Sequence, residues 1–87
     1  MRTYPLIISS PNGHVFKGDV VKLVLRGAAG DLAVLAGHIP FVTSVKPCDC
    51  RVEFSDGTER VGHTDGGILS VTGENTTLLS GSFQWKE

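Results

Sequence analysis

The stretch "GDLAVLAGHIPFVT", Gly30 to Thr43, raises the main question about this sequence of 87 residues. It is a short apolar run that opens with Gly-Asp and closes with Gly-His-Ile-Pro. Asp31 stands near its start and His38 near its end, as a carboxylate and an imidazole do in many active sites. The question is whether these two groups serve catalysis or belong to a surface that a partner recognises.

The length and charge of the chain narrow the possible functions. A chain of 87 residues forms a single domain, 1–87, and buries only about 60–65% of its unfolded surface, so a large enclosed substrate cavity is not expected. Lys and Arg number 8 against 9 Asp and Glu, which lacks the basic excess typical of nucleic-acid binding. No apolar run approaches the ~20 residues that span a bilayer, so we expect no direct membrane insertion and a cytosol-facing protein.

Glycine and proline divide the remaining sequence into short apolar runs. Eleven Gly and four Pro are spread evenly, and no run keeps helical periodicity for three turns. This pattern predicts an all-β fold of about nine or ten short strands, packed as a two-sheet β-sandwich or flattened barrel. The expected strands are Tyr4–Ser9, His14–Lys17, Asp19–Arg26, Leu32–Leu35, Phe41–Val45, Cys50–Phe54, Glu59–His63, Gly67–Val71 and Thr76–Leu79.

Two local patterns predict how these strands lie. Alternation in Asp19–Arg26 places Val21, Leu23 and Leu25 on the buried face, with Val20 and Val24 on the other. A second pattern is the segment from Arg51 to Val61, where Asp-Gly predicts a type I′ hairpin turn. The register of that hairpin would set Glu53 opposite Arg60 and Val52 opposite Val61. Near the end of the chain, Trp85 either folds back onto the sandwich or precedes further sequence.

Motifs for catalysis, cofactors or metals are weak. The sequence lacks a phosphate-binding loop and a G-x-S-x-G elbow, so we expect no catalytic residue and no cofactor. The one close His/Asp pair, His63 with Asp65, is interpreted as part of a turn. Cys48 and Cys50, with His14, His38 and His63 elsewhere, invite a zinc interpretation. The C-x-C spacing does not fit it, and two reduced thiols with no metal site are expected.

An ordered series of segments indicates a family. Its centre, Gly30 to Pro40, fits the pattern G-[DE]-L-x-[IV]-x-x-G-H-x-P. The other segments in the series are Leu6–Pro11, Val15–Gly18, Val45–Pro47, Gly66–Val71 and Thr77–Leu79. The series resembles the epsilon subunit of F-type ATP synthases along the whole chain without gaps.

The resemblance implies a non-catalytic subunit of the central stalk, the rotor that couples ion translocation to ATP synthesis. The implied partners are the gamma subunit and the c-ring, and the implied location is peripheral, on the cytoplasmic side of the cell membrane or its organellar equivalent. Asp31, with Gly30 and Ala29, matches the loop that faces the c-ring. The residues implied near the gamma contact are Ser10, His38, Ile39, Pro40, Phe41 and Thr43. The imidazole and the carboxylate of the opening stretch are thus interpreted as contact groups.

The sequence departs from the family pattern in two respects, and one alternative function remains open. Cys48 stands where the family usually has Gly, which puts a positive-φ turn there in doubt. The family continues into two helices, whereas this chain stops at Glu87, so we expect little restraint of ATP hydrolysis. The alternative function is that of a stand-alone β-sandwich that binds a small ligand or a metal through Cys48, Cys50 and a histidine.

Overall fold

The computed structural model describes residues 2–37 and 39–86, and all regular secondary structure within them is β. The all-β prediction is confirmed. Ten strands follow one another along the chain: β1 (Tyr4–Ser10), β2 (Gly13–Val20), β3 (Lys22–Gly27), β4 (Gly30–Leu35), β5 (Phe41–Val45), β6 (Cys48–Glu53), β7 (Glu59–Thr64), β8 (Gly67–Val71), β9 (Thr76–Ser80) and β10 (Phe83–Lys86).

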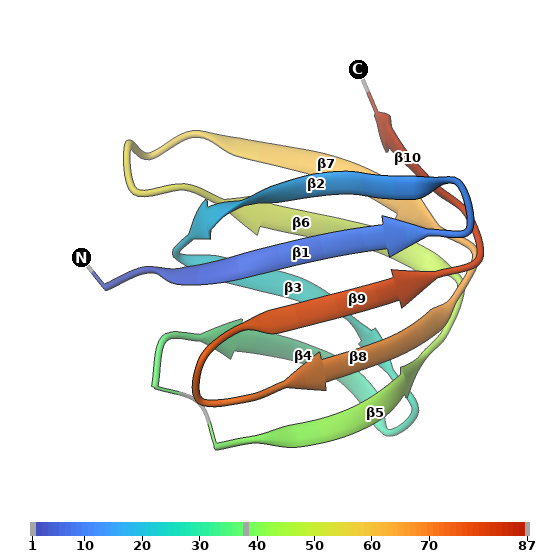
Figure 1. Ribbon diagram of the computed structural model, residues 1–87, viewed down its shortest axis with the longest axis horizontal. Coiled ribbons are helices and arrows are strands. Elements are labelled where there is room, and N and C mark those ends of the chain that lie inside the picture. The colour runs from blue at the N-terminus through green and yellow to red at the C-terminus, as the bar shows by residue number, and fades with distance from the viewer. Residues whose placement is uncertain (1, 38, 87) are drawn as a thin grey trace.

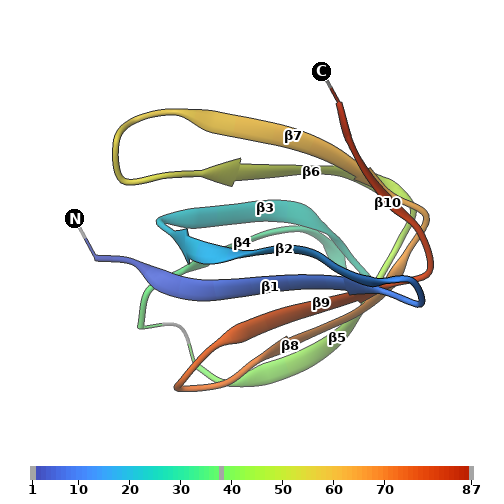
Figure 2. The same cartoon turned by 45° about the horizontal axis from the view of Figure 1, so that its top comes forward.

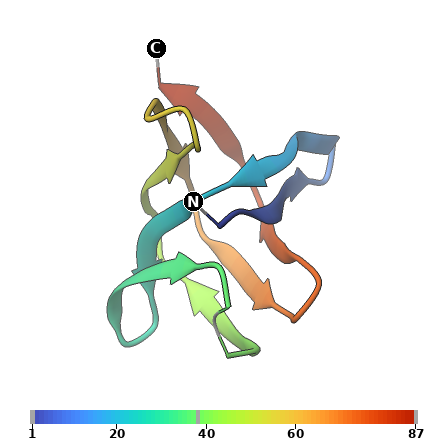
Figure 3. The same cartoon turned by 90° about the vertical axis from the view of Figure 1, so that its left-hand side faces the viewer.

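The strands form two layers that enclose one core. One layer has the order β10-β7-β6-β3, with β4 paired to the other side of β3, and the second has the order β5-β8-β9-β1-β2. They meet where Gly27 of β3 pairs with Val45 of β5. All pairs are antiparallel except β1 with β9, which is parallel. Figures 1 and 2 show the two layers, and the view along the strands in Figure 3 shows a flattened barrel around the core.

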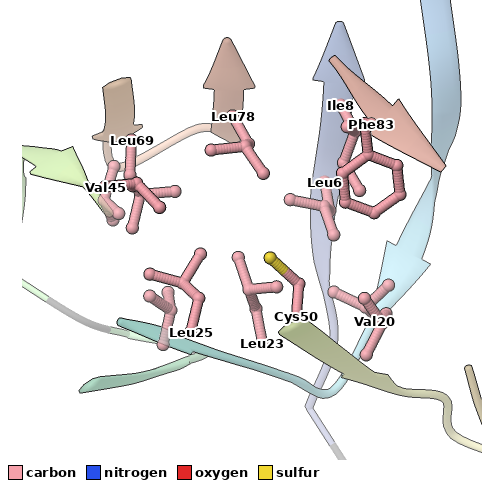
Figure 4. Close-up of a cluster of buried hydrophobic side chains, with 13 residues drawn as sticks. Leu6, Ile8, Val20, Leu23, Leu25, Val45, Cys50, Leu69, Leu78 and Phe83 are labelled. Atoms are coloured by element: carbon pink, nitrogen blue, oxygen red, sulfur yellow. The ribbon is translucent and has the colours of Figure 1, made fainter. Parts of the chain in front are cut away.

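Alternate side chains from both layers fill the interior. Figure 4 shows Leu23 and Leu25 of β3 facing Leu69 of β8 and Leu78 of β9 across the core. A buried side chain of this kind stabilises the fold by about 1.5–3 kcal/mol relative to an exposed one. The fully or nearly fully buried apolar residues are Leu6, Ile8, Val20, Leu23, Leu25, Val34, Val45, Cys50, Val52, Leu69, Val71, Leu78 and Phe83.

The predicted strand Asp19–Arg26 is two strands. The chain bends at Val21, between the end of β2 and the start of β3, and passes from one layer to the other. The bend resets the alternation, so Val20 is completely buried while Val21 is only partly buried. The prediction was right for Leu23 and Leu25 and wrong for Val20, which belongs to the core.

The hairpin between β6 and β7 exists, but its predicted register was wrong by one residue. Glu53 lies opposite Glu59, and Val52 lies opposite Arg60. Gly57 N–H donates to Phe54 O at 3.1 Å, and only Gly57 of this loop has a left-handed φ, +88°. A type I′ turn needs two such residues, whereas a type I turn followed by a left-handed glycine makes a three-residue loop.

The last strand, β10, was not predicted. It pairs with β7 and turns Phe83 and Trp85 inward. The Trp85 ring meets Phe16 of β2 edge-on at 5.7 Å and Phe83 at 5.1 Å, and the Arg60 guanidinium lies 3.9 Å from its centroid. This aromatic cluster packs β2 against β10, two strands that do not hydrogen-bond to each other. Trp85 therefore folds back onto the sandwich.

Candidate partner-binding surfaces

The outward side of β5, β8, β9 and β1 carries no charged side chain. We call it the uncharged face, and it consists of Ile7, Ser9, Val42, Ser44, Ile68, Ser70, Thr77 and Leu79. Three of its apolar side chains are well exposed: Val42 at 68%, Leu79 at 53% and Ile68 at 45%. Ile68 lies directly opposite Leu79, so the apolar groups adjoin across the strands. Val42 lies opposite Ser70, so hydroxyl groups alternate with the apolar side chains on this face. Exposed apolar side chains with no charge among them favour an interaction surface.

The side chains predicted to contact the gamma subunit occupy several places. Ile39 and Pro40 are exposed just before β5, whereas Phe41 and Thr43 face the interior side of that strand. Because β5 and β1 run in the same direction within their layer, Ser10 lies at the opposite end from Ile39. His38 lies outside the described residues, and the contacts themselves remain predictions.

The sequence analysis did not predict the outward-facing residues of β5 as contact residues. Val45 is buried, so strict alternation turns Val42 and Ser44 to the outside of β5. The alternation of inward and outward positions along β5 could have identified them from the sequence. Their neighbours Ile68 and Leu79 join the same face only through strand pairing.

The outward side of β3, β4, β6, β7 and β10 is different, because acids and bases pair across its strands. We call it the charged face. Its ion pairs are Lys22–Glu53 at 3.7 Å, Arg26–Asp31 at 2.9 Å, Arg51–Glu59 at 3.9 Å and Lys86–Asp49 at 2.9 Å. Nδ1 of His63 also hydrogen-bonds Oδ1 of Asp49 at 3.0 Å. Hydrogen bonds from Lys86 and then from His63 hold the pKa of Asp49 below its usual value.

Asp31 lies on the exposed hairpin between β3 and β4, beside Gly30 and Ala29. It stands directly opposite Arg26, whose Nε donates to Oδ1 at 2.9 Å. This hydrogen bond raises the pKa of the Arg26 guanidinium. Both side chains are more than half exposed. The predicted carboxylate is therefore on the surface, but it is one half of an ion pair.

The groups considered for catalysis or metal binding are separated. The Nδ1 atom of His63 pairs with Asp49 rather than with Asp65, whose Oδ1 accepts the Ser82 backbone N–H at 2.8 Å. Asp65 thus supports the turn between β9 and β10. In the described part of the chain, no three His, Cys, Asp or Glu side chains gather as metal ligands would.

The two thiols are unpaired and face inward. Burial raises the pKa of the Cys50 thiol to about 12. Cys48 accepts the Arg26 backbone N–H at 3.4 Å. Among the described residues only glycines have positive φ, so Cys48 introduces no left-handed strain at the start of β6.

The described residues also contain no helix that is long and apolar enough to span a membrane.

These surfaces define a class, a small all-β domain with one uncharged and one ion-paired face. Residues 3–86 match the family described as ATP synthase, Delta/Epsilon chain, beta-sandwich domain. The chain belongs to this family, which confirms the resemblance seen in its sequence.

Individual relatives agree with the family. The chain is 35% identical over 80 residues to the ATP synthase epsilon chain of Acinetobacter baylyi, covering 92% of this chain and 58% of that protein. It is 34% identical over 85 residues to "ATP synthase epsilon chain, sodium ion specific" of Acetobacterium woodii, covering 98% of this chain and 64% of that one. The chain thus spans somewhat less than two thirds of the length of these relatives.

Solved structures share the fold at low sequence identity. A chain of the Euglena gracilis mitochondrial ATP synthase superposes with a TM-score of 0.90 at 20% identity, covering 95% of this chain and 53% of that one. A chain of the Tetrahymena thermophila mitochondrial ATP synthase, central stalk and c-ring, gives 0.77 at 9% identity, covering 94% and 66%. At such identities the comparison supports the β-sandwich alone.

Proposed function

We propose that the chain is a non-catalytic part of the central stalk of an F-type ATP synthase. In this role it links the gamma subunit to the c-ring, so that ion-driven rotation reaches the catalytic head. Its chemistry is protein–protein recognition, and it sits peripherally at the cytoplasmic side of the membrane or its organellar equivalent. Family membership over residues 3–86 is the observation that carries this proposal.

The uncharged face is the part of the surface best suited to bind the gamma subunit. Leu79, Ile68 and Val42 are exposed there, and Ile39, a predicted gamma contact, is 78% exposed just before β5. Burying such side chains on binding releases water from apolar surface, at about 25 cal/mol per Å². This face carries no charged side chain, so binding there requires no desolvation of a charge. Apolar anchors of this kind commonly supply most of the affinity of an interface.

The c-ring contact is assigned to the hairpin between β3 and β4. That hairpin projects at the end of the sandwich where β1 and β5 finish, and it carries Ala29, Gly30 and Asp31. Small residues beside the carboxylate let a partner approach the backbone closely. The uncharged face and this hairpin therefore adjoin at the corner where Gly27 pairs with Val45.

Direct binding tests the proposal. We expect the purified chain to form a complex with isolated gamma subunit in size-exclusion chromatography, and the binary complex to bind c-rings in nanodiscs. A chain that binds neither would contradict the proposed function.

The alternative of a metal-binding sandwich predicts a different result. It requires stoichiometric zinc in protein purified without an affinity tag, measured by plasma mass spectrometry. A metal content that disappears in a Cys48→Ser variant would favour that alternative.

A further inference from the structure

The carboxylate assigned to the c-ring contact is held by a neighbour on its own hairpin. Arg26 and Asp31 are cross-strand partners on the outward side of β3 and β4, and Nε of Arg26 donates to Oδ1 of Asp31 at 2.9 Å. No other described side chain hydrogen-bonds Oδ2 of Asp31. The hairpin thus presents an oriented ion pair with an acceptor oxygen and guanidinium N–H groups left for a partner.

The backbone that carries the Arg26–Asp31 pair is held in place. Ala28 N–H donates to Ser44 O at 3.0 Å, and Lys46 N–H donates to Arg26 O at 3.0 Å, so the hairpin is tied to the end of β5. Gly27 is buried, and a Cβ there would come within 2.6 Å of the Leu32 side chain. The backbone below the ion pair is therefore fixed by hydrogen bonds and by packing.

A pocket beside the pair gives a partner side chain room. It has a volume of about 370 Å³, and its lining includes Arg26, Asp31, Pro47 and Cys48. The pair and the pocket together form a small polar receptor at this end of the sandwich.

We propose that Arg26 sets the specificity of this contact, both by orienting Asp31 and by donating to the partner, so that the c-ring meets a neutral, oriented Arg26–Asp31 pair rather than a lone carboxylate. This inference rests on the proposed function. The fitting partner is a polar loop with an amide or hydroxyl side chain that both donates to Asp31 and accepts from Arg26. A bare cation is a poor fit, because the field of a paired carboxylate is largely cancelled by its guanidinium.

The two modes of recognition predict opposite effects of one substitution. If Asp31 acts as a lone charge that attracts a basic loop, Arg26→Gln unmasks it and tightens binding. If the oriented pair is recognised, Arg26→Gln frees the carboxylate to rotate and removes donors, so binding weakens.

The experiment measures the affinity of the complex of this chain with the gamma subunit for c-rings in nanodiscs by biolayer interferometry. We expect Arg26→Gln and Asp31→Asn each to weaken binding by about two- to fivefold. The double variant should be no weaker than the poorer single variant, because the two groups act as one unit. Lys22→Gln is the matched control, since it removes one positive charge from the same face of β3 and should change nothing.

A second readout follows the pair without any partner. The Arg26 Nε–H signal in NMR should be protected from exchange in the parent chain and exposed in Asp31→Asn.

Tighter or unchanged binding of Arg26→Gln, or additive single effects, would overturn the inference while leaving the proposed function intact. A parent complex that forms with gamma but does not bind c-rings would instead refute the proposed contact, and the inference with it.

Discussion

The two outward sides of this sandwich are built from the same alternating strands but carry opposite chemistry. On the charged face each acid has a basic partner across the strands, as in Lys22–Glu53 and Arg51–Glu59. On the uncharged face the strands turn hydroxyl groups and exposed apolar side chains outward. The backbone does not cause the difference; the residues at outward positions do.

The difference supports different proposed roles for the two faces. A charged face whose ions are satisfied by each other would have to lose the water around those ions when a partner covers it, which costs free energy. The uncharged face has no such cost and gains from apolar burial. The comparison favours the uncharged face for the proposed gamma contact, whereas the proposed c-ring contact uses a single ion pair, Arg26–Asp31, at one end of the charged face.

The largest expected effect comes from placing a charge in the uncharged face. Leu79 lies at the outside of β9, between Ile68 of β8 and Ser9 of β1, and is 53% exposed. Leu79→Asp should weaken binding to the gamma subunit about 100-fold or more, because an unpaired carboxylate would be buried in the interface. Isothermal titration calorimetry measures the change, and circular dichroism checks the fold.

The matched control lies on the other side of the molecule. Leu35 has the same side chain and a similar exposure, 49%, but lies at the end of β4 away from the uncharged face. Leu35→Asp should leave the gamma affinity within about twofold of the parent. Equal losses from both variants would show that the comparison of faces does not locate the interface.

An intermediate effect, on stability, is expected from substituting Trp85, which anchors β10 to the rest of the sandwich. Trp85 is half-buried against Phe16 and Phe83, and Arg60 covers its ring. Trp85→Ala should lower the free energy of unfolding by about 2 kcal/mol, because the aromatic contacts and part of the apolar burial are lost. Trp85→Phe should lose about half as much, as measured by urea denaturation.

The Trp85→Ala variant also tests whether the charged face and the uncharged face act independently. β10 belongs to the layer that carries the charged face and lies outside the layer that carries the uncharged face. The gamma affinity of folded Trp85→Ala should therefore match that of the parent. A loss of affinity larger than the loss of stability would mean that β10 takes part in the interface.

The fold was predictable to the extent that local signals control it. Glycine and proline delimit the strands, and alternation placed Leu23 and Leu25 correctly. The hairpin register was not predictable from Asp-Gly alone, because it depends on whether Asp56 adopts a left-handed conformation. Asp56 instead accepts hydrogen bonds from the backbone N–H and the hydroxyl of Thr58 at 2.9 and 2.6 Å, which suits a type I turn.

The candidate site was predictable only in part, for a related reason. The exposed position of Asp31 follows from its glycine-flanked loop, but its bond to Arg26 depends on the register of β3 with β4. The uncharged face joins Val42, Ile68 and Leu79, which lie far apart in the sequence. Such a surface exists only after the strands have paired.

The smallest expected effect concerns the charged face and pH. The pKa of Asp49 is lowered from 3.8, first by the hydrogen bond from Lys86 and then by that from His63. A depressed carboxyl pKa contributes stability above the unfolded-state value, and this contribution is lost as the pH falls through the folded-state value. Asp49→Asn should therefore be slightly less stable than the parent at pH 7 and show a flatter loss of stability below about pH 4.

Chemical denaturation between pH 7 and pH 2 measures this slope. The control is Asp19→Asn, since Asp19 is exposed on β2 and forms no ion pair among the described residues. Its acid slope should match that of the parent, and 0.5 M salt, roughly, should shrink the difference for Asp49→Asn by screening the exposed charges. Gamma affinity should stay unchanged in both variants, because neither Asp49 nor Asp19 lies on the uncharged face that is proposed to bind the gamma subunit. If Asp49→Asn weakened gamma binding at pH 7, the charged face would have to be counted as part of the interface.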